Sequence, residues 1–299
     1  MGKGDSKKRI GTCALCKEEK VVLEESHILP KFVSRKQKKE SATGFLRNIY
    51  EPNKRIQDGD KQYLLCGKCE DLFNISETDF AKKVFLPFVE ERLTKFEYGK
   101  WLIYFICSVN WRNLYLDIEE WRKEEAYPKA KLDIFEKGEQ ELRKYLIGEK
   151  NELPTIQTHI FFFGDIKEAS GLNNSEPHTF FKHSSFGYSV QLDNGYYVVT
   201  NLLGLILVTI IRIPKQERWE YTRVYPKVGE LNPAEPQHVT SKLFGELFRY
   251  MKESEQAMDL MSESQKKLLV EEIRKNPQKL LDSKLHQDRL KDKMFQRDC

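Results

Sequence analysis

The sequence predicts an α+β protein with an N-terminal ββα finger, a helical middle, and an antiparallel β-sheet followed by C-terminal helices. Two Cys-x-x-Cys pairs delimit the finger, apolar residues at helical spacing fill the middle, and β-branched and aromatic runs appear after Pro154. The hydrophobic content of 39% with 12% aromatics is enough to form a core, so disorder is not expected. The expected divisions are a flexible basic arm over 1–10, a finger domain over 11–82, a helical segment over 83–150 and an α+β domain over 151–299.

Four of the six cysteines lie in the two Cys-x-x-Cys pairs, and we interpret them as the ligands of one structural metal ion. Thiolates are soft ligands, and four of them make the tetrahedral cage in which structural Zn²⁺ is bound. The pairs are separated by 49 residues, so the intervening segment must contain structure of its own. The expected zinc ligands are Cys13, Cys16, Cys66 and Cys69.

The segment between the cysteine pairs predicts a ββα unit. Residues 20–23 and 63–65 are short apolar runs typical of strands, and a helix is expected to begin near Glu70. Residues 31–61 are polar and charged, which predicts an insertion loop with a short helix and a final Asp-Gly-Asp turn. The finger contains a single histidine, His27.

The middle of the chain predicts helices. Apolar spacing is mostly helical over residues 70–122, and residues 127–150 form an amphipathic pattern. Trp101, Trp111 and Trp121 recur every ten residues, which a buried helical core explains better than a cofactor site.

After Pro154 the pattern changes to that of strands. The Asp-Asn-Gly sequence at residues 193–195 is a strong hairpin signal. Helical periodicity returns from Val239, and charged helices are expected over residues 265–275 and 279–291. The expected strands cover residues 158–163, 188–192, 196–200 and 205–213.

Three short motifs carry a family resemblance. They are the first cysteine pair, Ser26-His27-Ile28-Leu29-Pro30, and Leu65-Cys66-Gly67-Lys68-Cys69-Glu70. In these motifs the chain resembles the HNH endonuclease superfamily, also called ββα-metal or His-Me finger nucleases, in its four-cysteine, treble-clef-like form. The resemblance covers roughly the first 80 residues. It implies a zinc-stabilised finger that hydrolyses phosphodiester bonds.

The resemblance also implies roles for particular residues. His27 would be the general base that takes a proton from the attacking water, and one Mg²⁺ or Mn²⁺ would stabilise charge on the phosphate. Glu70 opens the helix where the family places a metal ligand, and Asn74 and Glu77 share its helix face. The structural alternatives are a histidine held in the finger core and, for Glu70, a carboxylate favoured by the helix dipole.

Two positions depart from the family pattern. Ser26 stands where the family has a metal-binding Asp or His before the base. The family also orients its imidazole with an Asn, whereas the usual position here holds Lys61 or Gln62. Asn48 and Asn53 lie nearby in the sequence without a defined alignment. These departures place the catalytic metal site in question, although they leave the zinc ligands and His27 in place.

Positive charge is concentrated on the finger. Residues 1–60 carry 14 Lys/Arg and 9 Asp/Glu, a balance of +5 against +4 for the whole chain, so the other residues sum to −1. This placement suits a nucleic-acid partner, with DNA the expected form, although a solvated surface also carries such an excess. The residues expected to contact nucleic acid are Arg35, Lys36, Lys38 and Lys39.

The composition predicts a cytoplasmic protein without a membrane partner. The longest apolar run, residues 202–213, is too short to span a bilayer, and the N-terminus lacks an apolar signal segment. Cys107 and Cys299 stand outside the metal-type pairs, which favours a reducing compartment. The C-terminal half offers a surface for a protein partner or for self-association.

Three functional hypotheses follow. The first is a metal-dependent HNH-type endonuclease, of a kind that serves in restriction or phage defence, with the C-terminal module positioning substrate or binding a partner. The second is a catalytically degenerate zinc finger that binds nucleic acid or protein. The third is a structural subunit whose finger caps the helical core. His27 and the basic excess favour the first hypothesis, and Ser26 favours the other two.

Overall fold

The computed structural model describes residues 9–41, 43–124, 127–164 and 175–298. It is a mixed helical and antiparallel β-sheet structure, which confirms this part of the predicted fold class. Residues 1–8 of the expected basic arm over 1–10 lie outside the described residues. Its last two residues, Arg9 and Ile10, belong to strand β1 (Arg9–Gly11). Cys299 also lies outside them.

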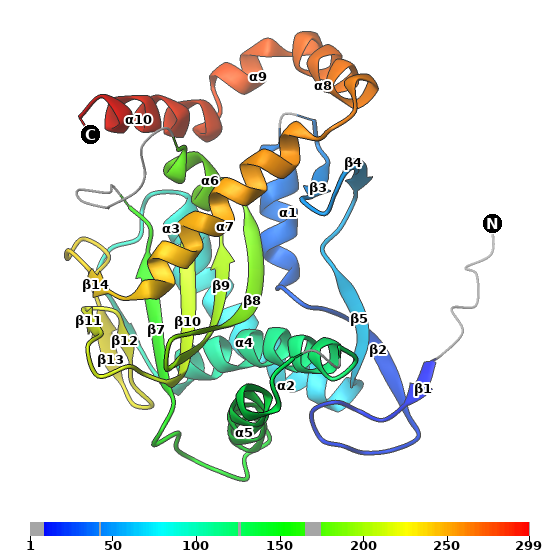
Figure 1. The fold of residues 1–299 in the computed structure, drawn as a ribbon, viewed down its shortest axis with the longest axis vertical. Helices are drawn as coiled ribbons and strands as arrows, with labels where there is room; N and C mark the ends of the chain where they lie inside the picture. Colours follow the sequence, from blue (N-terminus) through cyan, green and yellow to red (C-terminus); the bar gives the residue numbers. More distant parts are fainter. Residues whose placement is uncertain (1–8, 42, 125–126, 165–174, 299) are drawn as a thin grey trace.

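The finger contains a three-stranded antiparallel sheet. Its order is β1-β2-β5, with β2 at Val21–His27 and β5 at Lys61–Cys66. Helix α2 (Gly67–Phe80) follows β5 directly, so the second cysteine pair lies at the junction of strand and helix. Figure 1 shows this sheet to one side of the molecule, away from the larger sheet.

The segment expected to be an insertion loop is more ordered than its polarity suggests. It forms α1 (Lys31–Glu40) and a hairpin of β3 (Leu46–Asn48) and β4 (Glu51–Ile56). Helix α1 follows Pro30, and its Val33 is buried while its Phe32 packs against the rings of the finger and of the core helix. Two apolar side chains therefore dock a helix that is otherwise charged.

The helical middle is interrupted. After α2 the chain continues as a π-helical turn (Ala81–Phe85) and α3 (Leu86–Val89), then leaves the helix before the long core helix α4 (Lys100–Trp121). The interruption contains β6 (Phe96–Tyr98), which pairs with β13 (Gly229–Leu231). The predicted continuous helical stretch is thus divided, because residues 96–98 bond to a strand far along the chain.

Helix α4 is the centre of the core. Trp111 is fully buried in it, and Trp101 and Trp121 pack against the same cluster, in agreement with the core interpretation of the tryptophans. Helix α5 (Lys129–Leu146) packs against α4, and the Trp111 indole donates to Glu139 at 2.8 Å.

The large sheet has five antiparallel strands in the order β12-β7-β10-β9-β8. The Asp193-Asn194 turn joins β8 to β9, as predicted, and Asp193 takes the left-handed conformation that this turn needs (φ 51°). A short ribbon of β11 (Arg218–Glu220) and β14 (His238–Thr240) lies beyond the sheet. The strands are β7 (Gln157–Phe162), β8 (Ser185–Leu192), β9 (Gly195–Leu202), β10 (Leu205–Arg212) and β12 (Arg223–Val224).

Helices cover both faces of this sheet (Figure 1). Alternate residues of β9 belong to different clusters: Val198 lies with the α4 side and Val199 with the side of α7 (Lys242–Asp259). All residues of β9 are buried, as expected for a central strand with both faces covered.

A buried polar network joins α4 to the sheet. The Asn110 side chain donates to the Thr209 hydroxyl at 2.8 Å and accepts from the Thr200 hydroxyl at 2.7 Å, and Asn113 donates to Thr200 at 2.9 Å. Gly187 on β8 allows this approach, since a Cβ there would lie 2.3 Å from the Asn113 amide nitrogen. The network fixes the helix over the sheet.

The C-terminal helices return to α6 (Pro177–His183). The predicted helix over 279–291 is in fact two, α9 (Pro277–Leu281) and α10 (Lys284–Asp298), which follow α8 (Glu263–Lys275). Asp292 of α10 accepts from the backbone N–H groups of His178 and Thr179, each at 2.9 Å, and so caps the N-terminus of α6. No helix within the described ranges combines the length and apolar character needed to cross a membrane.

Candidate metal centre and histidine site

The four cysteines of the two pairs converge at one point in the finger. Their Sγ atoms all lie within 4.8 Å of one another, and Cys16 Sγ is 3.9 Å from Cys66 Sγ. Zn–S bonds of about 2.3 Å in a tetrahedron place neighbouring sulfurs about 3.8 Å apart. The sulfur positions therefore fit a zinc ion, as the sequence predicts.

The thiols are too close to ionise independently. Hydrogen bonding with Cys69 lowers the pKa of Cys13 to about 4, and the same contact raises the pKa of Cys69. Four thiolates cannot share so small a space without a cation, because like charges disfavour one another. A divalent ion with a preference for sulfur removes this conflict, and the backbone N–H of Cys66, 3.4 Å from Cys13 Sγ, supports one ligand.

His27 is the last residue of β2, and its imidazole points to the loop that precedes β5. Its Nε2 lies 3.1 Å from Oδ2 of Asp58, and its side chain is 14% exposed. Of the two neutral tautomers of His27, the Asp58 carboxylate favours the one with its proton on Nε2, because a carboxylate only accepts hydrogen bonds. Nδ1 is then an acceptor. The Asp58 contact thus orients the imidazole, and part of the His27 side chain is exposed to solvent.

Asp58 is held from several sides. It accepts from the backbone N–H of Gly59 at 3.0 Å and from the Ser34 hydroxyl at 3.3 Å, and Lys61 pairs with it at 2.9 Å. Burial opposes ionisation of Asp58, but the hydrogen bonds from Lys61 and His27 outweigh it and hold its pKa below the usual range. The partner of His27 is therefore a fixed anion.

Arg112 of α4 reaches the finger from the core. Its Nη1 donates to the backbone carbonyl of His27 at 2.7 Å, its Nη2 pairs with Glu77 of α2, and its guanidinium lies 5.2 Å from the centre of the Phe73 ring. The Arg112 side chain is 2% exposed and that of Glu77 is 18% exposed, so the ion pair is partly buried. It connects β2, α2 and α4.

The predicted metal-shell residues on α2 have different surroundings. Glu70 accepts a hydrogen bond from the Ser26 hydroxyl, on the opposite face of β2 from the His27 imidazole. Asn74 is exposed, and Glu77 is the partner of Arg112. Within the described ranges, the four cysteines are the one group of three or more His, Cys, Asp or Glu side chains arranged to hold a metal ion.

The predicted nucleic-acid contacts lie on α1, a helix rather than a loop. Arg35 and Lys39 are exposed and one helical turn apart, so they share an outward face. Lys36 pairs with Glu40 at 2.9 Å, and Lys38 donates to the Gln57 carbonyl at 3.1 Å. Two of the four cations are therefore directed outward and two are bound within the finger.

Sequence reasoning missed Asp58 and Arg112. Asp58 lies in the predicted Asp-Gly-Asp turn just before the second finger strand. The nucleases that the finger motifs resemble have an Asn in this region, and that position was the available signal. Arg112 is 85 residues from His27 and sits in an apolar helix, so nothing in the local pattern connects the two.

Comparison with known proteins adds no assignment. The chain matches no protein-family model, no curated protein and no solved structure.

Proposed function

We propose that the protein is a metal-dependent endonuclease of the HNH type, with a treble-clef-like zinc finger, that hydrolyses phosphodiester bonds of nucleic acid, with DNA the expected substrate. The observation that carries the proposal is the contact of His27 Nε2 with Asp58 Oδ2 at 3.1 Å. His27 lies at the end of β2, in the finger that also contains the four-cysteine site. The proposal includes a role in restriction or phage defence, which only the family resemblance supports.

The chemistry assigned to His27 is general-base catalysis. A water at Nδ1 loses a proton to the neutral imidazole and attacks the phosphorus, and Asp58 stabilises the resulting imidazolium across Nε2–H. The P–O bond to the leaving 3′ oxygen breaks, and this oxygen takes a proton from solvent. Asp58 thus orients the imidazole, as an Asn does in the HNH family, and it adds a negative charge. Arg112 fixes the backbone of the base through the His27 carbonyl.

A catalytic Mg²⁺ or Mn²⁺ would stabilise charge on the phosphate and on the leaving oxygen. Of the three α2 residues first assigned to it, Glu77 is disfavoured because Arg112 neutralises it. Glu70 and Asn74 retain the oxygen ligands that hard cations prefer. Glu70 accepts from Ser26 on the face of β2 opposite the His27 imidazole, which disfavours a single metal ion shared by Glu70 and His27.

The outward face of α1 supports a polyanionic substrate. Arg35 and Lys39 are exposed on it, and α1 begins four residues after His27. Phosphate contacts of this kind position a nucleic acid without reading its sequence.

A second candidate is the degenerate finger that binds nucleic acid or protein without cleaving it. The Glu77–Arg112 ion pair favours it, since this carboxylate serves the packing of α2 on α4. In this case the four cysteines and the basic face keep their roles, and His27 has a structural one.

Plasmid nicking distinguishes the two candidates. The zinc-loaded protein is incubated with supercoiled plasmid, single-stranded DNA or RNA in Mg²⁺ or Mn²⁺, next to His27→Ala and a control, His238→Ala, which removes an exposed imidazole from β14. The endonuclease proposal expects cleavage by wild type and His238→Ala only. Absence of cleavage of every substrate, with retained binding, would establish the second candidate.

A further inference from the structure

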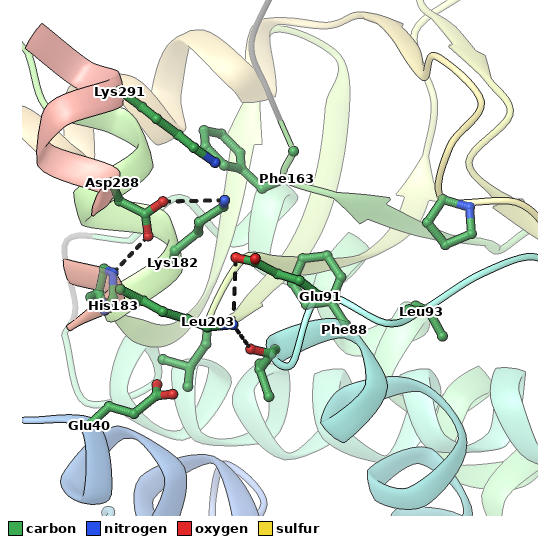
Figure 2. Close-up of a pocket in the computed structure, with 14 residues that line it drawn as sticks. Glu40, Phe88, Glu91, Leu93, Phe163, Lys182, His183, Leu203, Asp288 and Lys291 are labelled. Atoms are coloured by element: carbon green, nitrogen blue, oxygen red, sulfur yellow. Dashed lines mark hydrogen bonds and ion pairs between the residues drawn. The ribbon is translucent and has the colours of Figure 1, made fainter. Parts of the chain in front are cut away.

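Charged groups of the cavity between α6 and α10 pair with one another. Figure 2 shows Asp288 of α10 between Lys182 and His183 of α6, with contacts of 3.4 and 2.9 Å. Glu91, also at this cavity, lies 3.5 Å from Lys284. Because these groups already have partners, they do not require a charged ligand. A cavity at the edge of the large sheet differs in this respect.

This second cavity has a volume of about 430 Å³, and we call it the β12 cavity. It is lined by residues of the edge strand β12, of its neighbour β7, and of β11, β13 and the turns beside them. The volume lies in the range of roughly 300–1,000 Å³ that small-molecule sites occupy. Its aromatic and polar side chains indicate which chemistry it fits.

The segment from β11 through β12 lines the cavity with every second residue. These residues are Trp219, Tyr221, Arg223 and Tyr225. Between them, Thr222 and Val224 are buried, as expected for an extended chain whose side chains alternate in direction. Tyr221 and Tyr225 are 64% and 44% exposed, so both rings are accessible to a ligand.

Tyr221 has a strained backbone. Its φ of 61° is in the left-handed region, which a bulky residue rarely adopts, and the Gln237 amide holds it by donating to the Tyr221 carbonyl at 3.0 Å. Strained residues that the surrounding structure holds in place cluster at ligand-binding sites. An exposed aromatic ring at such a position is an observation independent of the alternating pattern.

Polar groups at the cavity have hydrogen-bonding capacity that no described residue uses. The Arg223 guanidinium lies 5.0 Å from the centre of the Tyr225 ring but makes no hydrogen bond or ion pair within the described ranges, and neither does the Glu235 carboxylate. His159, opposite Arg223 in the sheet, is neutral, because burial and the Arg223 charge lower the pKa of its imidazole to about 3. The Asn232 side chain accepts one backbone N–H at 3.1 Å and keeps its amide N–H groups for another partner.

The charges around the cavity disfavour a charged ligand. Arg223 and Lys227 already lie 5.0 and 5.7 Å from the centre of the Tyr225 ring, so they would repel a ligand cation from it. An anion drawn to Arg223 would also meet the Glu235 carboxylate at the same cavity. A neutral ligand with flat faces and hydrogen-bonding edges avoids both conflicts.

We propose that the β12 cavity binds a nucleobase, stacked on the exposed rings of Tyr221 and Tyr225. The donors and acceptors at the edge of the base are met by Arg223, Asn232 and Glu235. Aromatic rings and guanidinium planes stack on bases, and guanidinium, amide and carboxylate groups pair with base edges. A hexose also has hydrogen-bonding edges, but its ring is puckered and suits these flat groups less.

The base belongs either to a free nucleoside or to an unpaired nucleotide of a single strand, since both present the same ring and edges. The proposal goes beyond nuclease activity and does not depend on it, because the cavity belongs to the large sheet and its neighbours and not to the finger.

Isothermal titration calorimetry on the zinc-loaded full chain tests the proposal. The probes are adenosine, guanosine, cytidine, uridine, a single-stranded octamer containing all four bases, an abasic octamer and glucose. Saturable binding of a nucleoside, tighter than that of glucose, supports the proposal with a free nucleoside as the ligand. Binding of the base-containing octamer alone, tighter than that of the abasic strand, supports it with a base in a single strand. Failure of every nucleoside and of the octamer to exceed these controls would overturn it, and saturable binding of glucose in their place would identify a sugar site.

Tyrosine variants and a control locate the binding. Tyr221→Ala and Tyr225→Ala should each weaken binding by about fivefold or more, the effect of losing one base–aromatic stack. Tyr221→Phe should retain binding, because the ring remains. Tyr50→Ala, which removes an 80% exposed ring from the turn between β3 and β4, is the control and should bind as wild type does. Unchanged affinity in both cavity alanine variants would refute the site.

Discussion

Arg112 Nη1, in the core helix α4, donates to the backbone carbonyl of His27 at 2.7 Å. The same guanidinium pairs with Glu77 of the finger helix. The position of the proposed base is therefore set by the core of the protein as well as by the finger sheet. A buried Arg is suited to this role because its planar group bonds several acceptors at fixed angles.

Arg112→Met should destabilise the fold by about 2–4 kcal/mol, because it leaves Glu77 and the His27 carbonyl without their partner. Urea unfolding measures the loss. The double variant Arg112→Met/Glu77→Gln should recover part of it, since no buried charge is then unpaired. Equal stability of Arg112→Met and wild type would show that the ion pair does not hold the finger on α4.

Asp58→Ala should lower cleavage by about 10–100-fold, a typical effect of losing a residue that orients a functional imidazole. Asp58→Asn should retain more activity than Asp58→Ala, because an amide oxygen still accepts from Nε2–H. Initial rates of plasmid nicking provide the comparison. If both variants cleave as wild type does, Asp58 has no part in positioning His27.

Metal analysis of the purified protein should find about one zinc per chain, since four thiolates make one tetrahedral site. Cys66→Ser should lose the metal and lower the melting temperature, because metal binding contributes directly to the stability of such fingers. Cys107→Ala is the matched control: Cys107 is a buried thiol of α4 outside the cluster. Full zinc content in Cys66→Ser would contradict the four-cysteine site.

Asp117 provides a test of the fold that depends on pH. Burial raises its pKa to about 7, although the backbone N–H of Ser189 donates to it at 2.6 Å. The folded state thus holds the proton more tightly than the unfolded chain, whose Asp pKa is about 3.9. Its contribution to stability is complete below about pH 4 and is lost as the pH rises toward 7.

Asp117→Asn should therefore stabilise the protein more at pH 8 than at pH 5, with a difference on the order of 2 kcal/mol. Thermal unfolding at the two pH values measures it. Asp259→Asn, at an exposed residue of α7, serves as the control and should show no such dependence. A stabilisation by Asp117→Asn that does not change with pH would contradict the burial of this carboxyl.

The sequence predicted those features that depend on local patterns. The β-branched and aromatic run over β9 and the Asp-Asn-Gly turn identified the hairpin. The spacing of the cysteines identified the cluster whose ligand atoms lie within 4.8 Å of one another. These features are encoded within a few residues, by β propensity, turn conformation and the preference of thiolates for zinc.

Features that depend on contacts across the chain were not predicted. The break between α3 and α4 follows from the pairing of β6 with β13, more than a hundred residues away. The orientation of His27 depends on Asp58 and Arg112, which approach it from a loop and from the core helix. Local periodicity carries no information on such partners, whereas tertiary packing decides them.

The most direct test of the account is the rate of plasmid nicking by His27→Ala relative to wild type, measured on zinc-loaded samples with matched melting temperatures. Loss of a general base lowers the rate by about 10²–10⁴-fold, and the account predicts a reduction in this range. Equal rates for the two proteins would contradict the assignment of His27 as the base.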